Sequence, residues 1–164
     1  MGEVDALEIY LIRHAKAESP DPARWPNDDE RPLTPQGQME FARMLKTLGD
    51  LPSSVDLFVS SPLLRAKQTA DILVSERGWP NYGIWQEMSP DADPQETLDR
   101  LFSHRSLKSV ALVGHLPHIP AFLSLLLTGS SSALSVEYKK GAIARVTMNH
   151  DDGKRGALVW LAVP

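Results

Sequence analysis

Histidine and arginine side chains stand directly after several apolar, strand-like runs of this sequence. A neutral imidazole is a nucleophile or base near neutral pH, and a planar guanidinium matches the oxygens of a phosphate or carboxylate. Ligands of open α/β sheets bind beyond the carboxyl ends of the strands, so these side chains are predicted to meet in one anion-handling site. They are Arg13 and His14 after 7–12, Arg65 after the Ser60-Ser61 pair, Glu87 after 82–86, and His115 after 110–113.

Arg65 carries a second hint of an anion. It is predicted to lie in the first turn of a helix, where a cation is mildly unfavourable unless an anion is bound. Free N–H groups at a helix start also suit a phosphate. For an isolated arginine, exposure to solvent is the more common explanation, and Glu87 alone is more often a solvated loop acid. Because Arg65 and Glu87 follow strands that end at the same edge as Arg13, His14 and His115, a role in one anion-binding site is the favoured interpretation. His104 and His150 fall in a helix end and a turn, where no such convergence is expected.

A metal site is not expected. His115 and His118 have metal-like spacing, but no third ligand is near and Pro117 disrupts a helical i, i+3 pair. The chain has no cysteine, which excludes disulfides, thiolate catalysis and cysteine-ligated zinc or iron–sulfur centres. No cofactor is predicted.

The elements that must position these side chains alternate between strand and helix. Such alternation is typical of parallel βαβ units, and the last two strands form an antiparallel edge pair. We therefore expect one three-layer α/β/α domain over residues 1–164, with a mostly parallel sheet. The expected strands are 7–12, 55–59, 82–86, 110–113, 142–148 and 157–163, the last two joined by the turn 149–156. Helices are expected from Thr34-Pro35 to Gly49 with Met39, Ala42, Leu45 and Leu48 as the apolar face, from Ser61-Pro62 to Gly78 with Ala66, Thr69, Ala70 and Leu73 inward, over 94–102, and over 118–127.

Composition agrees with an ordinary globular protein of 164 residues, with 42% hydrophobic and 23% charged residues. Seventeen basic and 21 acidic residues give a net charge of −4, which argues against a nucleic-acid partner. The start of the chain is acidic where a secretory signal is basic, and the most apolar run, 119–127, is too short to span a bilayer. A cytoplasmic protein without a membrane partner is expected.

The long polar segment 15–33 contains four prolines and the acids Asp21, Asp28, Asp29 and Glu30. Irregular loops of this length are uncommon unless functional or disordered. Two interpretations stay open, a solvated acidic loop and a lid formed by 17–32.

Six segments, in this order and spacing, resemble the histidine phosphatase superfamily (phosphoglycerate mutase-like), and within it the SixA-type phosphohistidine phosphatases, over nearly the whole chain. Ala15 stands where the wider superfamily has glycine, a variant that points to the SixA-type members. The segments are Arg13-His14-Ala15, 31–37, 60–69, 87–90, 114–117 and 141–144.

The resemblance implies a phosphatase with no large cap insertion that acts through a covalent phosphohistidine intermediate, without a metal. It makes His14 the nucleophile and gives the transferring phosphoryl group three donors: Arg13, Arg65 and a His115 protonated against the anion. Glu87 matches the family's proton donor, although an imidazole leaving group needs such an acid less than an alkoxide does. Arg31 is expected to reach the phosphate or the substrate, with a structural role in the loop as the alternative.

Three functions are compatible with these residues. The first is a phosphatase acting on phosphohistidine of a protein, and the second is the same chemistry on a small phosphorylated metabolite. The third is a phosphate-binding regulatory module without catalysis, which the intact set of histidines and arginines disfavours. The sequence gives no indication of the oligomeric state.

Overall fold

The protein is described here by a computed structural model, which covers residues 6–104, 106–149 and 155–164. Six strands form one sheet in the order β3-β2-β4-β1-β5-β6. The first four are mutually parallel where they pair, and β5 runs antiparallel to both β1 and β6. This is the predicted mostly parallel sheet with an antiparallel edge. The strands are β1 (Ala6–Arg13), β2 (Leu57–Ser60), β3 (Gly83–Ile84), β4 (Ser109–Gly114), β5 (Ile143–Asn149) and β6 (Ala157–Ala162).

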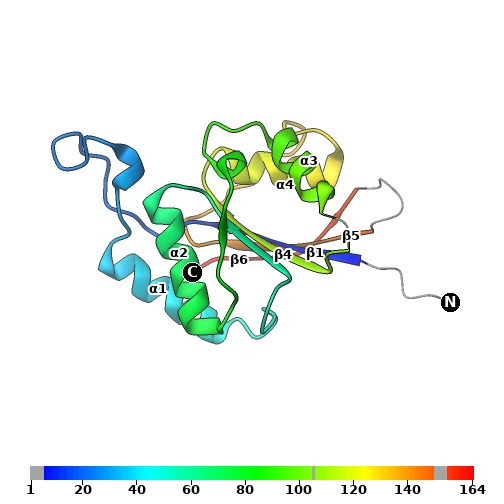
Figure 1. The fold of residues 1–164 in the computed structure, drawn as a ribbon, viewed down its shortest axis with the longest axis horizontal. Coiled ribbons are helices and arrows are strands. Elements are labelled where there is room, and N and C mark those ends of the chain that lie inside the picture. The colour runs from blue at the N-terminus through cyan, green and yellow to red at the C-terminus, as the bar shows by residue number, and fades with distance from the viewer. Residues whose placement is uncertain (1–5, 105, 150–154) are drawn as a thin grey trace.

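Four helices cover the two faces of the sheet and make the three layers (Figure 1). Helices α1 (Pro35–Thr47) and α2 (Leu64–Arg77) lie on one face, and α3 (Pro94–Ser103) and α4 (His118–Thr128) lie on the other. Capping signals in the sequence account for several of the ends. Thr34 accepts a hydrogen bond from Gly37 N–H at the start of α1, and Gly78 ends α2 with a φ of 66°.

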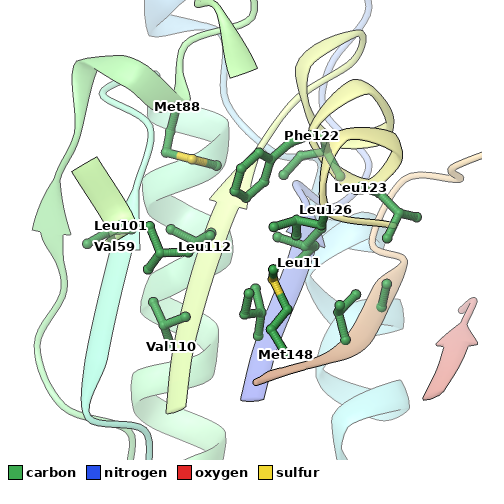
Figure 2. Close-up of a cluster of buried hydrophobic side chains, with 14 of the residues drawn as sticks. Leu11, Val59, Met88, Leu101, Val110, Leu112, Phe122, Leu123, Leu126 and Met148 are labelled. Carbon is green, nitrogen blue, oxygen red and sulfur yellow. The ribbon is translucent and has the colours of Figure 1, made fainter. Parts of the chain in front are cut away.

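Alternation along the central strands divides the apolar residues between two cores. In β1, Leu7, Ile9 and Leu11 point toward α3 and α4, whereas Tyr10 and Ile12 face α1 and α2. The first core contains Phe122, Leu123 and Leu126 of α4 packed over β1 and β4 (Figure 2). With both faces buried, the strands cannot slip by one residue without exposing a whole set of apolar side chains.

The long segment after β1 is closed at its base by a short ladder. Ala17 and Leu33 form an isolated antiparallel bridge, and Glu18 N–H donates to Pro32 O at 2.9 Å. Thr34 N–H donates to Lys16 O at 3.0 Å. Beyond this base the segment projects past the end of the sheet (dark blue in Figure 1) and includes a short 3-10 helix, Asp28–Glu30.

Several local predictions were wrong. Met39 is 62% exposed, because the buried face of α1 is formed by Gly37, Phe41, Met44 and Leu45. Helix α2 begins at Leu64 rather than at Ser61-Pro62, since Ser61 still continues the strand by donating its N–H to Val113 O. Strand β3 is only two residues long, and the chain turns at once into a 3-10 helix, Gln86–Met88.

No helix among the described residues is long and apolar enough to cross a membrane.

Candidate active site

The parallel register of β1 and β4 brings two histidines together. Arg13 pairs with Gly114, so that His14 and His115 leave the sheet side by side. Their ring centroids are 5.1 Å apart with an angle of 52° between the planes. His14 N–H donates to Gly114 O at 3.0 Å, which fixes the first residue beyond the strand. The sheet itself therefore places both imidazoles at its carboxyl edge.

The tautomer of His14 follows from its hydrogen bond. Its Nδ1 lies 2.7 Å from Ala15 O, and because a carbonyl only accepts, Nδ1 must carry the proton. Burial, then the cations Arg65, Arg13 and Arg31, outweigh this bond and lower the pKa of His14 to about 3. The ring is therefore neutral at physiological pH, with the lone pair on Nε2. That is the protonation state of a nucleophile.

Two arginines bring unpaired donors to the same place. Arg13 donates from Nη1 to Tyr138 O at 2.7 Å, while its buried Nε has no hydrogen-bond partner. Arg65 is 5% exposed, and its Nε is likewise buried without a partner. Burial of a polar N–H without a partner is unfavourable, so these nitrogens are suited to an incoming acceptor.

Together these side chains line a cavity of about 320 Å³ at the carboxyl edge of the sheet. Five cationic residues and the two imidazoles contribute to its wall, although the whole chain is acidic. Burial and the nearby cations Arg13, Arg31 and Lys16 lower the pKa of Lys140 on the rim. The lining includes Arg13, His14, Lys16, Arg31, Arg65, His115 and Lys140.

An acidic residue of the loop holds two of these cations. Asp28 receives Arg31 Nε at 2.8 Å and lies 3.3 Å from Arg65 Nη2, and its backbone carbonyl accepts from Arg65 Nη1 at 3.0 Å. Hydrogen bonding from Arg31 is the main cause that lowers the pKa of the Asp28 carboxyl. Asp28 is therefore not simply solvated. It holds Arg65 by Nη1 and Nη2, which leaves Arg65 Nε without a partner.

His115 is held differently from His14. Its Nε2 lies 2.7 Å from Ser61 Oγ, and its Nδ1 is buried without a hydrogen-bond partner. Burial first, and then His14 and Arg65, lower its pKa to about 2. These effects favour a neutral ring at physiological pH in the protein alone, whereas the sequence predicts an imidazolium once an anion is bound. A neutral imidazole still offers one N–H.

Glu87 is not among the described residues that line this cavity. Its carboxylate forms an ion pair with Arg100 Nη1 of α3, and the Arg100 guanidinium lies 4.4 Å from the Trp85 ring centroid. Hydrogen bonding to its own backbone N–H, and then Arg100, lowers the pKa of Glu87. The early end of β3 directs this side chain toward α3 instead of toward the imidazoles.

The two other described histidines, His104 and His118, contact other parts of the fold. Thr97 Oγ1 donates to Glu87 O at 2.7 Å, so His118 Nε2–H is the donor in its 2.8 Å bond to Thr97. His104 ends α3 and stacks on Trp85, whereas His150 lies outside the described residues. In the described part of the chain, no three histidine, aspartate or glutamate side chains gather as a metal-binding group.

Sequence reasoning missed the residues that support the site from behind. Thr69 Oγ1 accepts Ala15 N–H at 3.0 Å and donates to Arg65 O at 2.8 Å, joining the strand end to α2. Gln68 Oε1 accepts Leu33 N–H at 2.7 Å. The signal for both was their place in the segment 60–69. Tyr138 gave no local signal, because its contact with Arg13 spans 125 residues.

Comparison with known proteins identifies the family. The family model of the histidine phosphatase superfamily (branch 1) matches residues 9–93, more than half of the chain. The chain belongs to this superfamily. Its matched region contains the strand-end residues Arg13 and His14, the 3-10 helix Asp28–Glu30 and the start of α2 with Arg65.

Two sequence relatives and one solved structure are similar to this chain over most of its length. The phosphohistidine phosphatase SixA of Escherichia coli is 26% identical over 161 residues, covering 96% of this chain and 94% of that protein. An uncharacterized protein of Picosynechococcus sp. is 29% identical over 127 residues, covering 76% of each chain. A structure of the protein histidine phosphatase SixA complexed with tungstate superposes with a TM-score of 0.80 at 24% identity, covering 94% of this chain and 96% of that one. It shows the shared phosphoglycerate mutase-like fold.

Proposed function

We propose that this protein is a phosphatase that hydrolyses phosphohistidine on a protein, through a covalent phosphohistidine intermediate and without a metal. One observation carries the proposal. A neutral histidine with a free Nε2 shares a cavity with three buried nitrogens that lack partners: Arg13 Nε, Arg65 Nε and His115 Nδ1. The site thus places a nucleophilic nitrogen beside hydrogen-bond donors that have no acceptor. A phosphoryl group satisfies both.

The reaction proceeds in two displacements. His14 Nε2 attacks phosphorus, the bond from phosphorus to the substrate nitrogen breaks, and the substrate imidazole leaves. Water then attacks the same phosphorus, the bond to His14 Nε2 breaks, and orthophosphate is released. The donors of Arg13, Arg65 and His115 bind the equatorial oxygens in both transition states. The positions of these donors in the protein are already set, which lowers the cost of reorganisation.

The ion pair of Glu87 favours a nitrogen leaving group. An alkoxide leaves with a proton from an acid, whereas a phosphoimidazole takes up a proton from solvent on its other ring nitrogen near neutral pH and then leaves as neutral imidazole. Glu87 is ionised, and Arg100 holds its carboxylate outside the cavity. The cavity thus contains donors for the phosphoryl oxygens, and the carboxylate that matches the family's proton donor is not among its described lining residues.

The surroundings of the cavity support a protein substrate. The rim residues Lys16, Ser19 and Lys140 are exposed, so the site opens directly to solvent. We infer that residues 1–164 act as one histidine phosphatase domain without a large cap insertion, which leaves room for a macromolecule. The name of the Escherichia coli relative, a phosphohistidine phosphatase, is in agreement.

The test compares rates on a ³²P-phosphohistidine protein and on a panel of phosphorylated metabolites, with the wild type and His14→Ala. We expect faster release of phosphate from the phosphohistidine protein, and none above background with His14→Ala. A brief incubation with the labelled substrate is expected to leave acid-labile, base-stable label on His14. Faster turnover of a metabolite would favour the small-molecule alternative. Label on Ser60 or Ser61 would exclude the mechanism, and no turnover of any substrate would favour the regulatory module.

A further inference from the structure

Ser61 is a buried hydroxyl at the edge of the site to which the reaction above gives no part. It is 0% exposed and directly follows β2. Its N–H donates to Val113 O at 3.0 Å, which fixes its backbone beside the end of β4. This register brings Ser61 Oγ to 2.7 Å from His115 Nε2. The contact therefore depends on the sheet and not on a flexible loop.

The proton of this hydroxyl can be assigned by counting donors and acceptors. A serine hydroxyl has one proton and two lone pairs. Leu63 N–H already donates to Ser61 Oγ at 3.2 Å, and among the described residues the other polar neighbour is His115 Nε2. If His115 Nε2 carried a proton, both neighbours would donate to Ser61 Oγ. The buried hydroxyl proton would then have no acceptor, which is costly.

The consequence reaches the other nitrogen of the ring. When Nε2 accepts the Ser61 proton, a neutral His115 carries its own proton on Nδ1. Nδ1 is the atom that is buried without a partner, on a residue that lines the cavity. In the opposite tautomer Nδ1 would present a lone pair, and two lone pairs repel when a phosphoryl oxygen approaches.

We propose that Ser61 is a positioning residue that fixes His115 in the Nδ1–H tautomer, so that a neutral imidazole donates to the bound phosphoryl oxygen. The proposal rests on the proposed function for the identity of that anion. The tautomer itself is a property of the protein alone. Ser61 acts through His115 and does not touch the reacting atoms.

The decisive measurement is the tautomer of His115, from long-range ¹H–¹⁵N correlation NMR of the full chain at pH 7, with His115→Gln used for assignment. We expect the Nδ1–H pattern in the wild type, its loss in Ser61→Ala, and its return in Ser61→Thr, which keeps the hydroxyl. Ser60→Ala is the matched control, because it removes a neighbouring buried hydroxyl whose hydrogen bond goes to Ser61 O and not to His115. It is expected to keep the pattern.

Kinetics give the second readout. Loss of one donor to a developing oxyanion lowers kcat by about 10²–10³-fold, and a mixed tautomer in Ser61→Ala is expected to lower it by about 10–100-fold. Orthophosphate inhibition should weaken in parallel, and Ser61→Thr should restore both. An Nε2–H pattern in the wild type, or an unchanged pattern in Ser61→Ala, would overturn the proposal. If Ser61→Ala does not fold, the wild-type pattern alone decides.

The two proposals fail separately. An inactive protein with the expected tautomers would refute the phosphatase and leave the role of Ser61 in place. An active phosphatase with His115 in the Nε2–H form would support the phosphatase and refute the role of Ser61.

Discussion

At Glu87 we expect the two substrate classes, phosphohistidine and phosphomonoesters, to respond differently to substitution. In the free protein its carboxylate is paired with Arg100, so protonating an alkoxide requires Glu87 to leave Arg100 and to take up a proton, a step that an imidazole leaving group does not need. We expect Glu87→Gln to lower kcat for phosphohistidine by less than about threefold, because an imidazole leaving group needs no acid, and to lower phosphomonoester hydrolysis by a larger factor. Steady-state kinetics on both substrates measure this. Equal losses would count against any role of Glu87 as an acid.

Asp28 tunes the same cavity by charge. It lies beside Arg65 and Arg31 and opposes the binding of a second anion. Two like charges about 6 Å apart repel by about 0.7 kcal/mol in water and by about 3 kcal/mol near a protein surface, and solvent screening of the half-exposed Asp28 carboxylate favours the lower figure, so Asp28→Asn is expected to tighten competitive inhibition by orthophosphate about threefold to tenfold. The amide keeps an acceptor for Arg65, and the backbone bond from Arg65 to Asp28 O remains.

The matched control for Asp28 is Glu30→Gln, which removes an exposed acid of the same 3-10 helix. We expect it to change phosphate inhibition by less than twofold. A similar gain in both variants would show a general effect of net charge and not the contact with Arg65.

Among the elements, α1 is joined to the site by its first turn. A Cβ added at Gly37 would lie 2.2 Å from Lys16 O, so α1 starts in direct backbone contact with the segment that lines the cavity. Gly37→Ala must displace one of the two. We expect it to lower the free energy of unfolding by about 2–3 kcal/mol, measured by urea denaturation, and to lower kcat as well.

Gly49→Ala is the control for Gly37. It lies just beyond α1, and no atom stands within 4 Å of its added Cβ. A change within about 0.5 kcal/mol is expected there. Equal stability of Gly37→Ala and the wild type would show that the contact with Lys16 is loose.

The elements also show what the sequence could predict. Buried strands such as β1 and β4 could be predicted because each is a short apolar run that ends at a charged or histidine residue. Their parallel order then brings Arg13, His14, Arg65 and His115 to the same edge of the sheet. Glu87 did not follow this rule. Strand β3 has two residues, and beyond it Glu87 pairs with Arg100 of α3, a tertiary contact that no local pattern encodes.

The same distinction applies to α1 and to the loop before it. Met39 fitted the apolar spacing of the helix but is exposed, because the buried face of α1 is formed by Gly37, Phe41, Met44 and Leu45, with Gly37 close to Lys16 O. The contact of Asp28 with Arg65 spans 37 residues and has no signature in composition. Long-range contacts of this kind explain what the sequence alone did not predict.

At the scale of the whole molecule, three buried histidines make stability depend on pH. Burial lowers the pKa values of His14, His115 and His118 to about 3, 2 and 4. In the unfolded chain they titrate near pH 6.5, so their contribution is fully present above that pH. Below it the unfolded state binds protons that the folded state does not, and stability falls as the pH drops toward the folded pKa values.

We therefore expect the free energy of unfolding to decrease between pH 7 and pH 5 by on the order of 1–2 kcal/mol for each of these histidines. His118→Gln keeps an N–H donor for Thr97 and does not titrate, so it should reduce the slope by about a third while leaving catalysis nearly unchanged. Urea denaturation at a series of pH values tests this. If unfolding free energy falls with pH equally steeply in His118→Gln and in the wild type, His118 does not contribute to the pH dependence of stability.

The hydrogen bonds that close the base of the segment 18–32 separate the length of this loop from the positions of the residues in the candidate active site. Ala17, Leu33 and their neighbours already hold the two ends together, and residues 21–26 are not among the residues that line the cavity, so the length of the chain there can change without moving the lining residues. Each doubling of a flexible loop costs only about 0.6 kcal/mol. Segments inserted there, upstream of Asp28, are therefore expected to change what the protein recognises while leaving Arg13, His14, Arg65 and His115 in place.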